Sequence, residues 1–469
     1  MGKNTIVLYP SPAVGHLISM VELGKFILKH QPSFSIIVLI TIPPYHTETI
    51  TPVLKRLSET TSSIHFYHLP LLSLPLDSST NSPHFETLVF KLLRMNTPHV
   101  EQALQTISQT STIQAFIFDV FCFSALQVAD SLNIPAFYFY TSGIASLSLF
   151  LFFSTFHHKN ITTKNAETID FNSPGVPPIS PSDMPKVLLD HTSEAYQEFL
   201  YCSSQIPKSK GIIVNSFESL EPRALEAISN GLCVPHAPTP PVYCIGPLIA
   251  TEGRDHECLS WLDAQPSRSV VFLCFGSLGS FSQEQLIEIA TGLERSDQRF
   301  LWVVRNPPSK DELKSFTAPA EPDLDVLLPE GFFNRIRGKG LVIKSWAPQV
   351  EILSKDSVGG FVTHCGWNSV LEAICAGVPM VGWPLYAEQR MNRVFLVEEM
   401  KLALPMEDSE GGFVDAEEVE KRVRELMESD EGKMLRERTL RMQNAAKVAM
   451  TETGSSFRAL TKLTELWMQ

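Results

Sequence analysis

The sequence lacks any apolar run long enough to cross a membrane. Its longest apolar stretch, roughly 144–156, is interrupted by serines, whereas a membrane helix needs about 20 predominantly apolar residues. The apolar run near the N-terminus meets Pro10 after a few residues, which fits a first strand better than a signal peptide. We therefore expect a cytoplasmic protein without stable membrane insertion.

Clusters of basic residues are also missing. The chain carries 38 Lys and Arg against 51 Asp and Glu, a formal net charge of −13, and has no basic stripe that could follow a phosphate backbone. Nucleic acid is therefore not an expected partner. A nucleotide ligand stays compatible with this charge, because backbone amides and helix N-termini can hold a diphosphate without a basic surface.

The cysteines show no metal-binding pattern. All eight are scattered, with no CxxC pair and no Cys/His cluster at metal-ligand spacing. We expect reduced, buried thiols, no bound metal and no cofactor. The sequence contains no coiled-coil seam that would argue against a monomer, so we expect a monomer.

What the sequence does contain is a repeated alternation of short apolar runs and amphipathic segments. The runs predicted to be strands are 6–9, 35–42, 114–119, 136–140 and 211–217, then 269–277, 300–305, 340–346, 359–364 and 379–384. This alternation predicts βαβ units, hence parallel sheets with helices on both faces. Because 469 residues exceed one ordinary core and a Pro-rich segment interrupts the pattern, we expect domains at 1–240 and 255–450 joined by a linker at 241–254.

The segment 346–389 carries the strongest candidate site. The apolar run 359–364 is followed by a turn at 365–367, and Asn368 and Ser369 open a predicted helix. A helix N-terminus offers unpaired N–H groups to an anion, and Gly366 lets the backbone come close, so this outlines a diphosphate site. Glu372, one turn into the helix, could accept ribose hydroxyls, and Trp346 could face a base. Taken singly, Asn-Ser could be an ordinary N-cap and Trp346 a core residue.

Together these residues resemble a known family. The WAPQ opening, the HCGWNS centre, Glu372, the GVP and the closing Glu-Gln stand at the spacing of the signature box of plant secondary-product glycosyltransferases, the UDP-dependent enzymes of glycosyltransferase family 1. The resemblance extends over essentially the whole chain. It implies an α/β GT-B fold, with two doubly wound Rossmann-like domains facing a central cleft and a C-terminal helix, 451–469, that packs back on the N-terminal domain.

The resemblance also implies ligand roles for particular residues. Uracil would stack on Trp346 and pair with the Ala347 backbone, while Gln349 and Glu372 would bind ribose. The remaining donor contacts would come from phosphate-binding residues, namely Ser277, His364, Asn368 and Ser369, and from sugar-binding residues, namely Thr141, Trp367, Glu388 and Gln389. Gln389 resembles the members that prefer UDP-glucose. Ala387 and His16 are expected to contact the acceptor.

A catalytic pair is expected in the first domain. His16 follows the first predicted strand, and Asp119 ends the strand QAFIFD, so both should reach the carboxyl edge of one sheet. Deprotonating an acceptor hydroxyl needs a base that titrates near neutral pH, and a carboxylate on one ring nitrogen would fix its tautomer. The family resemblance gives His16 and Asp119 these roles, in an inverting transfer of glucose.

Other interpretations and the acceptor are less determined. A dehydrogenase should show GxGxxG, whereas this chain offers only FGSLGS at 275–280; a non-catalytic UDP-sugar binding protein would not need the catalytic pair. Asp323-Leu324-Asp325 matches the DxD of metal-dependent glycosyltransferases, but its Pro-rich context at 306–328 predicts a solvated loop. The acceptor pocket should involve aromatic-rich segments near 84–100, 120–125 and 180–205, although these could equally be core. A flavonoid, isoflavonoid or dihydrochalcone is expected, with C-glucosylation and a triterpenoid or hormone acceptor as alternatives.

Overall fold

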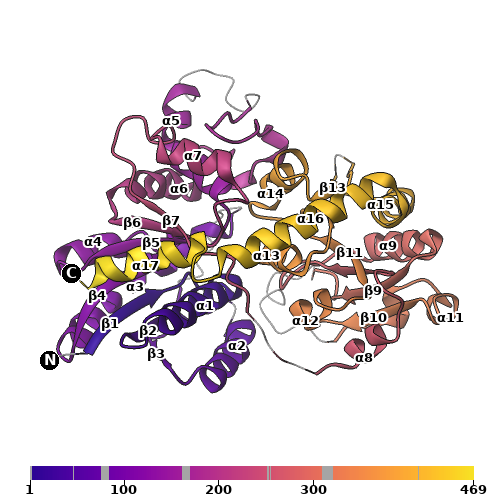
Figure 1. Ribbon diagram of the computed structural model, residues 1–469, viewed down its shortest axis with the longest axis horizontal. Helices are drawn as coiled ribbons and strands as arrows, with labels where there is room; N and C mark the ends of the chain where they lie inside the picture. The colour runs from indigo at the N-terminus through magenta and orange to yellow at the C-terminus, as the bar shows by residue number, and fades with distance from the viewer. Residues whose placement is uncertain are drawn as a thin grey trace. The chain divides into compact units, whose positions relative to one another are not determined.

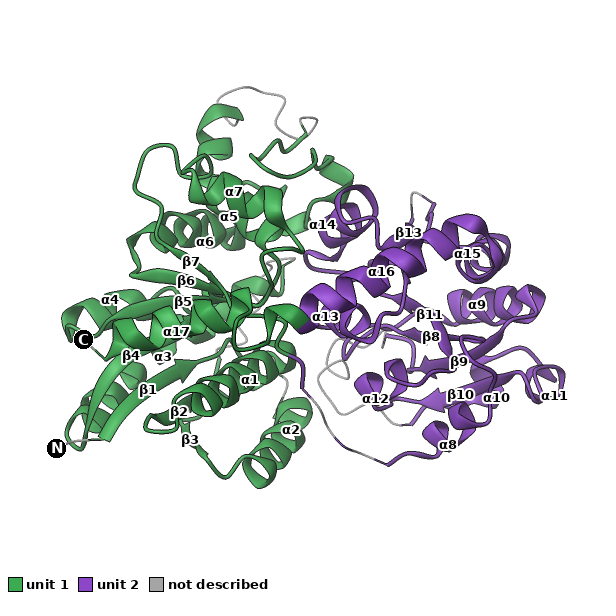
Figure 2. Cartoon of the chain, viewed as in Figure 1, with its two compact units in different colours: residues 1–248, 448–469 green, residues 249–447 purple. Residues whose placement is uncertain are grey.

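The computed structural model describes residues 3–45, 47–74, 84–160, 170–250, 253, 255–308, 321–409 and 411–468. The chain divides into two compact units (Figure 2). Unit 1 comprises residues 1–248 and 448–469, and unit 2 comprises residues 249–447. Most of the loop expected at 306–328 lies outside the described residues.

A parallel sheet forms the centre of unit 1. Among the described residues its strand order is β3-β2-β1-β4-β5-β6-β7. The strands are β1 (Lys3–Tyr9), β2 (Ser35–Ile40), β3 (Ile64–His68), β4 (Ser111–Asp119), β5 (Ala136–Tyr140), β6 (Gly211–Val214) and β7 (Val242–Cys244). The order reverses between β1 and β4, and ligands of such sheets bind at the carboxyl ends of strands beside this switch point.

Helices cover both faces of this sheet (Figure 1). They are α1 (Val14–His30), α2 (Thr47–Thr60), α3 (Glu86–Ser108), α4 (Ala125–Ser131), α5 (Ile144–Asn160), α6 (Glu194–Gln205), α7 (Pro222–Ser229) and α17 (Ser455–Trp467). Alternate strand residues such as Ile6 and Leu8 join one core with α1, α2 and α17, while Val7 between them is buried on the other face. This burial on both faces explains the continuous apolar runs in the sequence.

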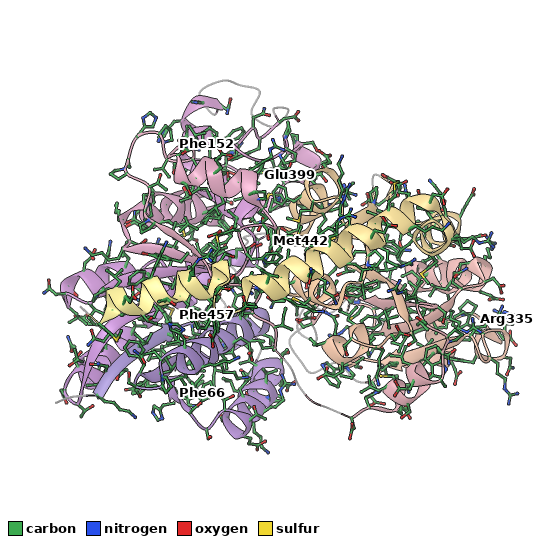
Figure 3. The ribbon with its side chains drawn as sticks, viewed as in Figure 1. Phe66, Phe152, Arg335, Glu399, Met442 and Phe457 are labelled. Atoms are coloured by element: carbon green, nitrogen blue, oxygen red, sulfur yellow. The ribbon has the colours of Figure 1, made fainter. Side chains whose placement is uncertain are left out.

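The C-terminal helix α17 packs within unit 1. Its Leu460, Leu463 and Trp467 are buried in the core that α1 and β1 also form. Phe457, labelled in Figure 3, meets the ring of His30 in α1 edge-on, with centroids 4.6 Å apart. The last segment of the chain therefore contributes to the core of the unit that contains the first.

Unit 2 is built on a second parallel sheet. Its strand order, for the residues the structure describes, is β10-β9-β8-β11-β12-β13, with the reversal between β8 and β11. The strands are β8 (Val270–Cys274), β9 (Arg299–Val304), β10 (Gly340–Lys344), β11 (Val358–Thr363), β12 (Met380–Gly382) and β13 (Ala403–Pro405). Each sheet thus has its own switch point, as expected of two doubly wound domains.

The helices of unit 2 pack on this sheet. They are α8 (Glu257–Asp263), α9 (Gln283–Ser296), α10 (Leu324–Leu327), α11 (Phe332–Arg335), α12 (Gln349–Leu353), α13 (Trp367–Ala376), α14 (Gln389–Val394), α15 (Ala416–Glu428) and α16 (Asp430–Ala449). The core on one face joins α9, α10, α11 and α15 to the strands. Side-chain caps mark several of these starts; for example, Ser282 accepts from the backbone N–H of the third residue of α9, and Asp415 from that of the third residue of α15.

Several elements differ from the sequence-based expectation. Strand β3 was not predicted, because an edge strand exposed on one side carries polar residues at alternate positions. Strand β13 was missed because it has only three residues. Strand β7 falls inside the segment expected to be a linker and pairs with β6, so the connection between the units is shorter than 241–254.

Candidate active site

The first cluster of predicted residues lies at the switch point of the sheet in unit 1. Strands β1 and β4 are parallel neighbours, with Tyr9 paired to Phe118, so the segments that follow them leave the same edge. After β1, residues 10–13 form a loop and His16 lies in the first turn of α1. Asp119 is the last residue of β4. The sheet order thus brings together two residues 103 positions apart.

His16 and Asp119 form a direct hydrogen bond. The distance from His16 Nδ1 to Asp119 Oδ2 is 2.6 Å, and the carboxylate is fully buried whereas the imidazole is 25% exposed. The second carboxylate oxygen, Oδ1, accepts from the backbone N–H of Phe121 at 3.1 Å. This second bond fixes the orientation of the carboxylate, so Asp119 can hold one tautomer of the ring and leave Nε2 as the proton acceptor.

Thr141 joins this pair from the next strand of the sheet. It follows β5, and its Oγ1 lies 3.2 Å from His16 Nδ1. The structure therefore brings Asp119 and Thr141, which end or follow two neighbouring strands, to the imidazole of His16, which follows a third strand. It also gives Thr141 a contact with the histidine that the sequence did not indicate.

A buried carboxylate holds the segment that carries Thr141. Glu221 accepts hydrogen bonds from the backbone N–H groups of Ile144 and Ala145, at 2.9 and 2.8 Å, and from Ser216 Oγ at 2.5 Å. Burial raises the pKa of Glu221. The first turn of α5, three residues after Thr141, is thus tied to the segment after β6.

Aromatic side chains extend from the histidine into unit 1. The ring of Phe121 is 5.5 Å from that of His16 and 5.8 Å from the rings of both Phe90 and Phe199. Phe90 and Phe199, from α3 and α6, are buried, while Phe121 is only partly covered. The aromatic-rich segments therefore do meet, but most of these rings are core, and Phe121 is the one that contacts His16.

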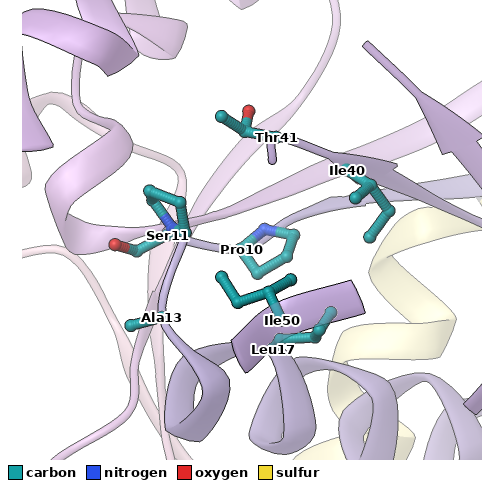
Figure 4. A pocket seen from close by; sticks show the side chains of 8 residues that line it. Pro10, Ser11, Ala13, Leu17, Ile40, Thr41 and Ile50 are labelled. Atoms are coloured by element: carbon teal, nitrogen blue, oxygen red, sulfur yellow. The ribbon is translucent and has the colours of Figure 1, made fainter. Parts of the chain in front are cut away.

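A small hollow lies beside the loop that follows β1. It is lined by the residues labelled in Figure 4, together with Pro12, from the loop 10–13, α1, the end of β2 and α2. Thr41, on its rim, lies within 3.4 Å of the hydroxyl of Tyr9. The lining is mostly apolar, and none of the predicted site residues belongs to it.

The second cluster lies at the switch point of the sheet in unit 2. Ser277 follows β8, His364 directly follows β11, and Trp346 follows β10, so these residues leave the same edge of one parallel sheet. The helix α13 begins at Trp367 with Gly366 as N-cap, rather than at Asn368 and Ser369 as expected. Because Gly366 has no side chain, the N-cap contributes no side-chain hydrogen bond to the first turn of α13.

The predicted ribose-binding residues contact one another. Gln349 Nε2 donates to Glu372 Oε2 at 2.6 Å and to Ser369 Oγ at 2.8 Å. These contacts join the start of α12 to the first turns of α13. Two residues expected at ribose and one expected at phosphate therefore form a single hydrogen-bonded group.

His364 is packed against two glycines. A Cβ at Gly276 or at Gly366 would lie 2.5 or 2.4 Å from its Nε2, closer than real atoms approach. Burial lowers the pKa of His364 to about 4, so the ring is neutral at pH 7. Its Nδ1 is buried and has no hydrogen-bond partner among the residues that the structure describes. We expected Gly366 to let the backbone approach a ligand. In the structure, the absence of a Cβ at Gly366 and at Gly276 also makes room for the ring of His364.

The remaining predicted residues flank this group. Trp346 is 38% exposed, which excludes the alternative that it is a core residue, while Ala347 beside it is buried. Trp367 is buried in the first turn of α13, and Asn368 beside it is partly exposed. Ser277 is exposed.

The end of the segment forms a tight turn before α14. Gln389 is buried, and its Oε1 accepts from the backbone N–H groups of Leu385 and Tyr386 at 2.9 and 3.0 Å. Ala387 takes a left-handed backbone conformation, with φ of 52°, and Glu388 is the N-cap of α14. The structure thus shows a turn-stabilising contact for Gln389.

Two further residues support this edge and were not predicted. Asn392 is fully buried and donates to the carbonyl of Cys365 at 3.0 Å, which holds the turn before α13. Arg305, directly after β9, donates from Nη1 to the carbonyl of Ser277 at 2.5 Å. The rule that found Asp119, a polar residue that ends or follows an apolar strand, would also have found Arg305.

The Asp323-Leu324-Asp325 segment is partly helical rather than a loop. Asp323 is the N-cap of α10, and its side chain accepts from the backbone N–H of Asp325. This local bond gives the Asp323 side chain a capping role at the start of α10. Across the described ranges, no three His, Cys, Asp or Glu side chains are grouped so that they could hold a metal ion.

No helix in the described part of the chain is both long enough and apolar enough to span a membrane. All eight cysteines are unpaired thiols. Burial raises the pKa of all eight; for Cys365, which follows His364 in the chain, it is raised to about 12. They are therefore protonated at neutral pH.

Known proteins match this chain over most of its length. Residues 224–431 match the family model described as UDP-glucoronosyl and UDP-glucosyl transferase. An anthocyanidin 5,3-O-glucosyltransferase from a Rosa hybrid cultivar is 49% identical, with both chains fully covered. A phloretin 2'-O-glucosyltransferase from Malus domestica is 50% identical over 97% of this chain and 98% of its own.

Solved structures show the same fold. UGT2 of Phytolacca americana, complexed with UDP-2fluoro-glucose and pterostilbene, is 36% identical with a TM-score of 0.87, covering 99% of this chain and all of its own. A UDP-glucosyltransferase from Polygonum tinctorium, described as capable of glucosylating indoxyl, is 36% identical with a TM-score of 0.88 over 99% of each chain. The GT-B class expected from the sequence is confirmed. The chain belongs to the UDP-glucoronosyl and UDP-glucosyl transferase family.

Proposed function

We propose that this chain transfers glucose from UDP-glucose to a hydroxyl group of a small phenolic acceptor of the flavonoid or dihydrochalcone type. The named activities of relatives about 50% identical over nearly the whole chain, on anthocyanidin and on phloretin, support this substrate class. The observation that carries the catalytic part is the 2.6 Å bond between a partly exposed His16 and a fully buried Asp119.

In the proposed reaction His16 is the general base. With Nδ1–H donating to Asp119, Nε2 takes the proton of the acceptor hydroxyl. The acceptor oxygen forms a bond to the anomeric carbon of glucose while the bond from that carbon to the β-phosphate oxygen breaks. UDP leaves with that electron pair, and an α-linked donor gives a β-glucoside. Asp119 stabilises the imidazolium that forms.

Unit 2 would hold the donor. Trp346 is exposed enough to stack on uracil, and the Gln349–Glu372 pair offers oxygens and an amide to ribose. The N-terminus of α13 and the unpartnered, neutral His364 would bind the diphosphate. The charge that develops on UDP would thus meet oriented amides and side chains, so we propose that the transfer needs no metal and no further cofactor.

Near the glucose, the proposed contacts are Thr141, Trp367, Glu388 and Gln389. In unit 1 the acceptor would lie beside His16 and Phe121, where an aromatic ring would find apolar contact. We further propose a cytoplasmic monomer, since unpaired thiols suit a reducing compartment.

A mass-spectrometric assay of the full chain tests this proposal. UDP-glucose and EDTA are incubated with a panel of flavonoids, dihydrochalcones, simple phenols and triterpenoids, and products heavier by one hexose are sought. Acid hydrolysis of the product separates an O-glucoside, which is cleaved, from a C-glucoside, which is not.

We expect a hydrolysable phenolic glucoside in the presence of EDTA. Products from triterpenoids alone would contradict the acceptor class. UDP binding without turnover on any acceptor would leave a UDP-sugar binding protein, and activity restored only by a divalent cation would contradict metal independence.

A further inference from the structure

Arg305 lies at the sheet edge of unit 2 that carries the proposed UDP-sugar-binding residues. The proposed function assigns it no contact with the ligand. Arg305 directly follows β9, the neighbour of β8 in a parallel sheet, so it leaves the same edge as Ser277. Its Nη1 donates to the carbonyl oxygen of Ser277 at 2.5 Å. A guanidinium has five N–H donors, so this bond leaves most of its hydrogen-bonding capacity unused.

No ion pair with the described part of the chain neutralises the positive charge of Arg305. Among the described residues, no carboxylate lies within ion-pair distance of it. Two other arginines of unit 2 differ in this respect. Arg335, labelled in Figure 3, is 2.6 Å from Glu294, and Arg390 is 2.6 Å from Asp408. Arg305 is therefore a partly buried cation that keeps its full charge.

The titratable groups that interact electrostatically with Arg305 do not offset its positive charge. Cys274 and Tyr386 act on Arg305, but burial raises the pKa of Cys274 to about 11 and raises that of Tyr386, so both are neutral at pH 7. Burial also lowers the pKa of Arg305 itself, although an arginine stays protonated at any working pH. Holding an unpaired charge away from water is unfavourable, and an anionic ligand would relieve that cost.

The position of Arg305 relates it to the diphosphate site. The Ser277 that it holds follows Gly276, and Gly276 lies against the ring of His364. The guanidinium is thus linked through one short loop to the histidine whose Nδ1 lacks a partner. A planar fork of N–H donors matches the oxygens of a phosphate, and the net charge of −13 makes a local cation valuable for a dianionic or trianionic ligand.

We propose that Arg305 binds the diphosphate of the nucleotide sugar directly, as the cation that offsets the charge on the departing UDP. This inference rests on the proposed function and adds a residue to it. In this arrangement one N–H of Arg305 positions the Ser277 loop, and the others face the phosphate oxygens. The opposing interpretation is that Arg305 only braces the loop and contributes no charge to binding.

Calorimetric titration of the full chain with uridine, UMP and UDP separates these interpretations. Arg305→Gln keeps a donor for the Ser277 carbonyl and removes the charge. We expect UDP affinity to fall roughly 10- to 100-fold, UMP affinity to fall less, and uridine affinity to stay unchanged, because only the phosphates gain a charge-assisted bond. The matched control is Arg299→Gln, at the amino end of the same strand, which should leave all three affinities unchanged.

Two results would overturn the proposal. Wild-type UDP affinity in Arg305→Gln would show that the charge is not used, and equal weakening of uridine and UDP would show a loop-bracing role. If Arg305→Gln does not melt cooperatively, Arg305→Lys provides the same test, since lysine keeps the charge but cannot bind bidentately and should weaken UDP moderately without affecting uridine. Failure of the proposed function is seen separately, as absence of UDP binding or of glucosyl transfer in the wild-type chain.

Discussion

Each unit places a histidine at the switch point of its parallel sheet, but the two histidines differ in their exposure and in their hydrogen-bond partners. His16 is partly exposed and bonded to a buried carboxylate, whereas His364 is buried, lies against two glycines and has no bonded carboxylate. The first arrangement stabilises a protonated ring, and the second opposes it. The same residue type therefore suits proton uptake in unit 1 and neutral hydrogen bonding in unit 2.

The largest expected effect comes from removing the first histidine. His16→Ala removes the proposed base, so we expect kcat for a phenolic acceptor to fall roughly 10²- to 10⁴-fold. UDP affinity should stay unchanged, because the proposed donor contacts of unit 2 remain. Steady-state kinetics and calorimetry measure the two quantities.

His30→Ala is the matched control for this change. His30 lies in the same helix, α1, but contacts Phe457 instead of Asp119. Its removal should leave kcat intact. Full turnover by His16→Ala would contradict the assignment of the base and remove the contrast between the two histidines.

The second prediction concerns the pH dependence of stability that His364 causes. Its pKa is about 6.5 in an unfolded chain and about 4 when buried, so the unfolded state binds the extra proton between these values. As pH falls from about 6.5 to about 4, His364 should lower the free energy of unfolding by up to about 3 kcal/mol. Above pH 6.5 this contribution disappears.

Urea unfolding of the wild-type chain and His364→Gln at several pH values measures this difference. The other histidines are present in both proteins and cancel in the comparison. The wild type should lose stability relative to the variant as the solution becomes acidic. Parallel pH profiles would show that the environment of His364 is not the one that its burial implies.

The smallest expected effect comes from the glycine beside His364. Gly276→Ala would place a Cβ 2.5 Å from the ring in a left-handed backbone, with φ of +74°. Gly338 is a matched control, because it has a similar φ of +81° and a Cβ added there would meet nothing within 4 Å. We expect Gly276→Ala to cost about 1–3 kcal/mol more than Gly338→Ala, from the clash alone.

Chemical unfolding of both glycine variants gives this difference, and titration with UDP adds a functional measurement. Displacement of the His364 ring should weaken UDP only in Gly276→Ala. Equal destabilisation of the two variants would mean that backbone strain dominates and that the packing of the ring contributes little.

The two sites also differed in how far the sequence could predict them. Segment 346–389 is continuous, so its local pattern predicted the turn and the new helix, and its resemblance to a known family supplied most of the proposed donor residues. The site of unit 1 joins positions 16, 119 and 141, and only the rule that parallel strands end at one edge suggested that the first two meet. The short strands β7 and β13 were missed because three residues carry too little periodicity.

By itself, the sequence determined two parallel α/β domains, because apolar periodicity is written along the chain. Its resemblance to a known family indicated the family and supplied most of the proposed site residues. Only the tertiary structure decided which side chains touch. It placed Thr141 against His16, joined Gln349 to Glu372, and turned Arg305 toward Ser277. Such contacts depend on strand order and on the packing of loops at a sheet edge, which bring together residues that no sequence period relates.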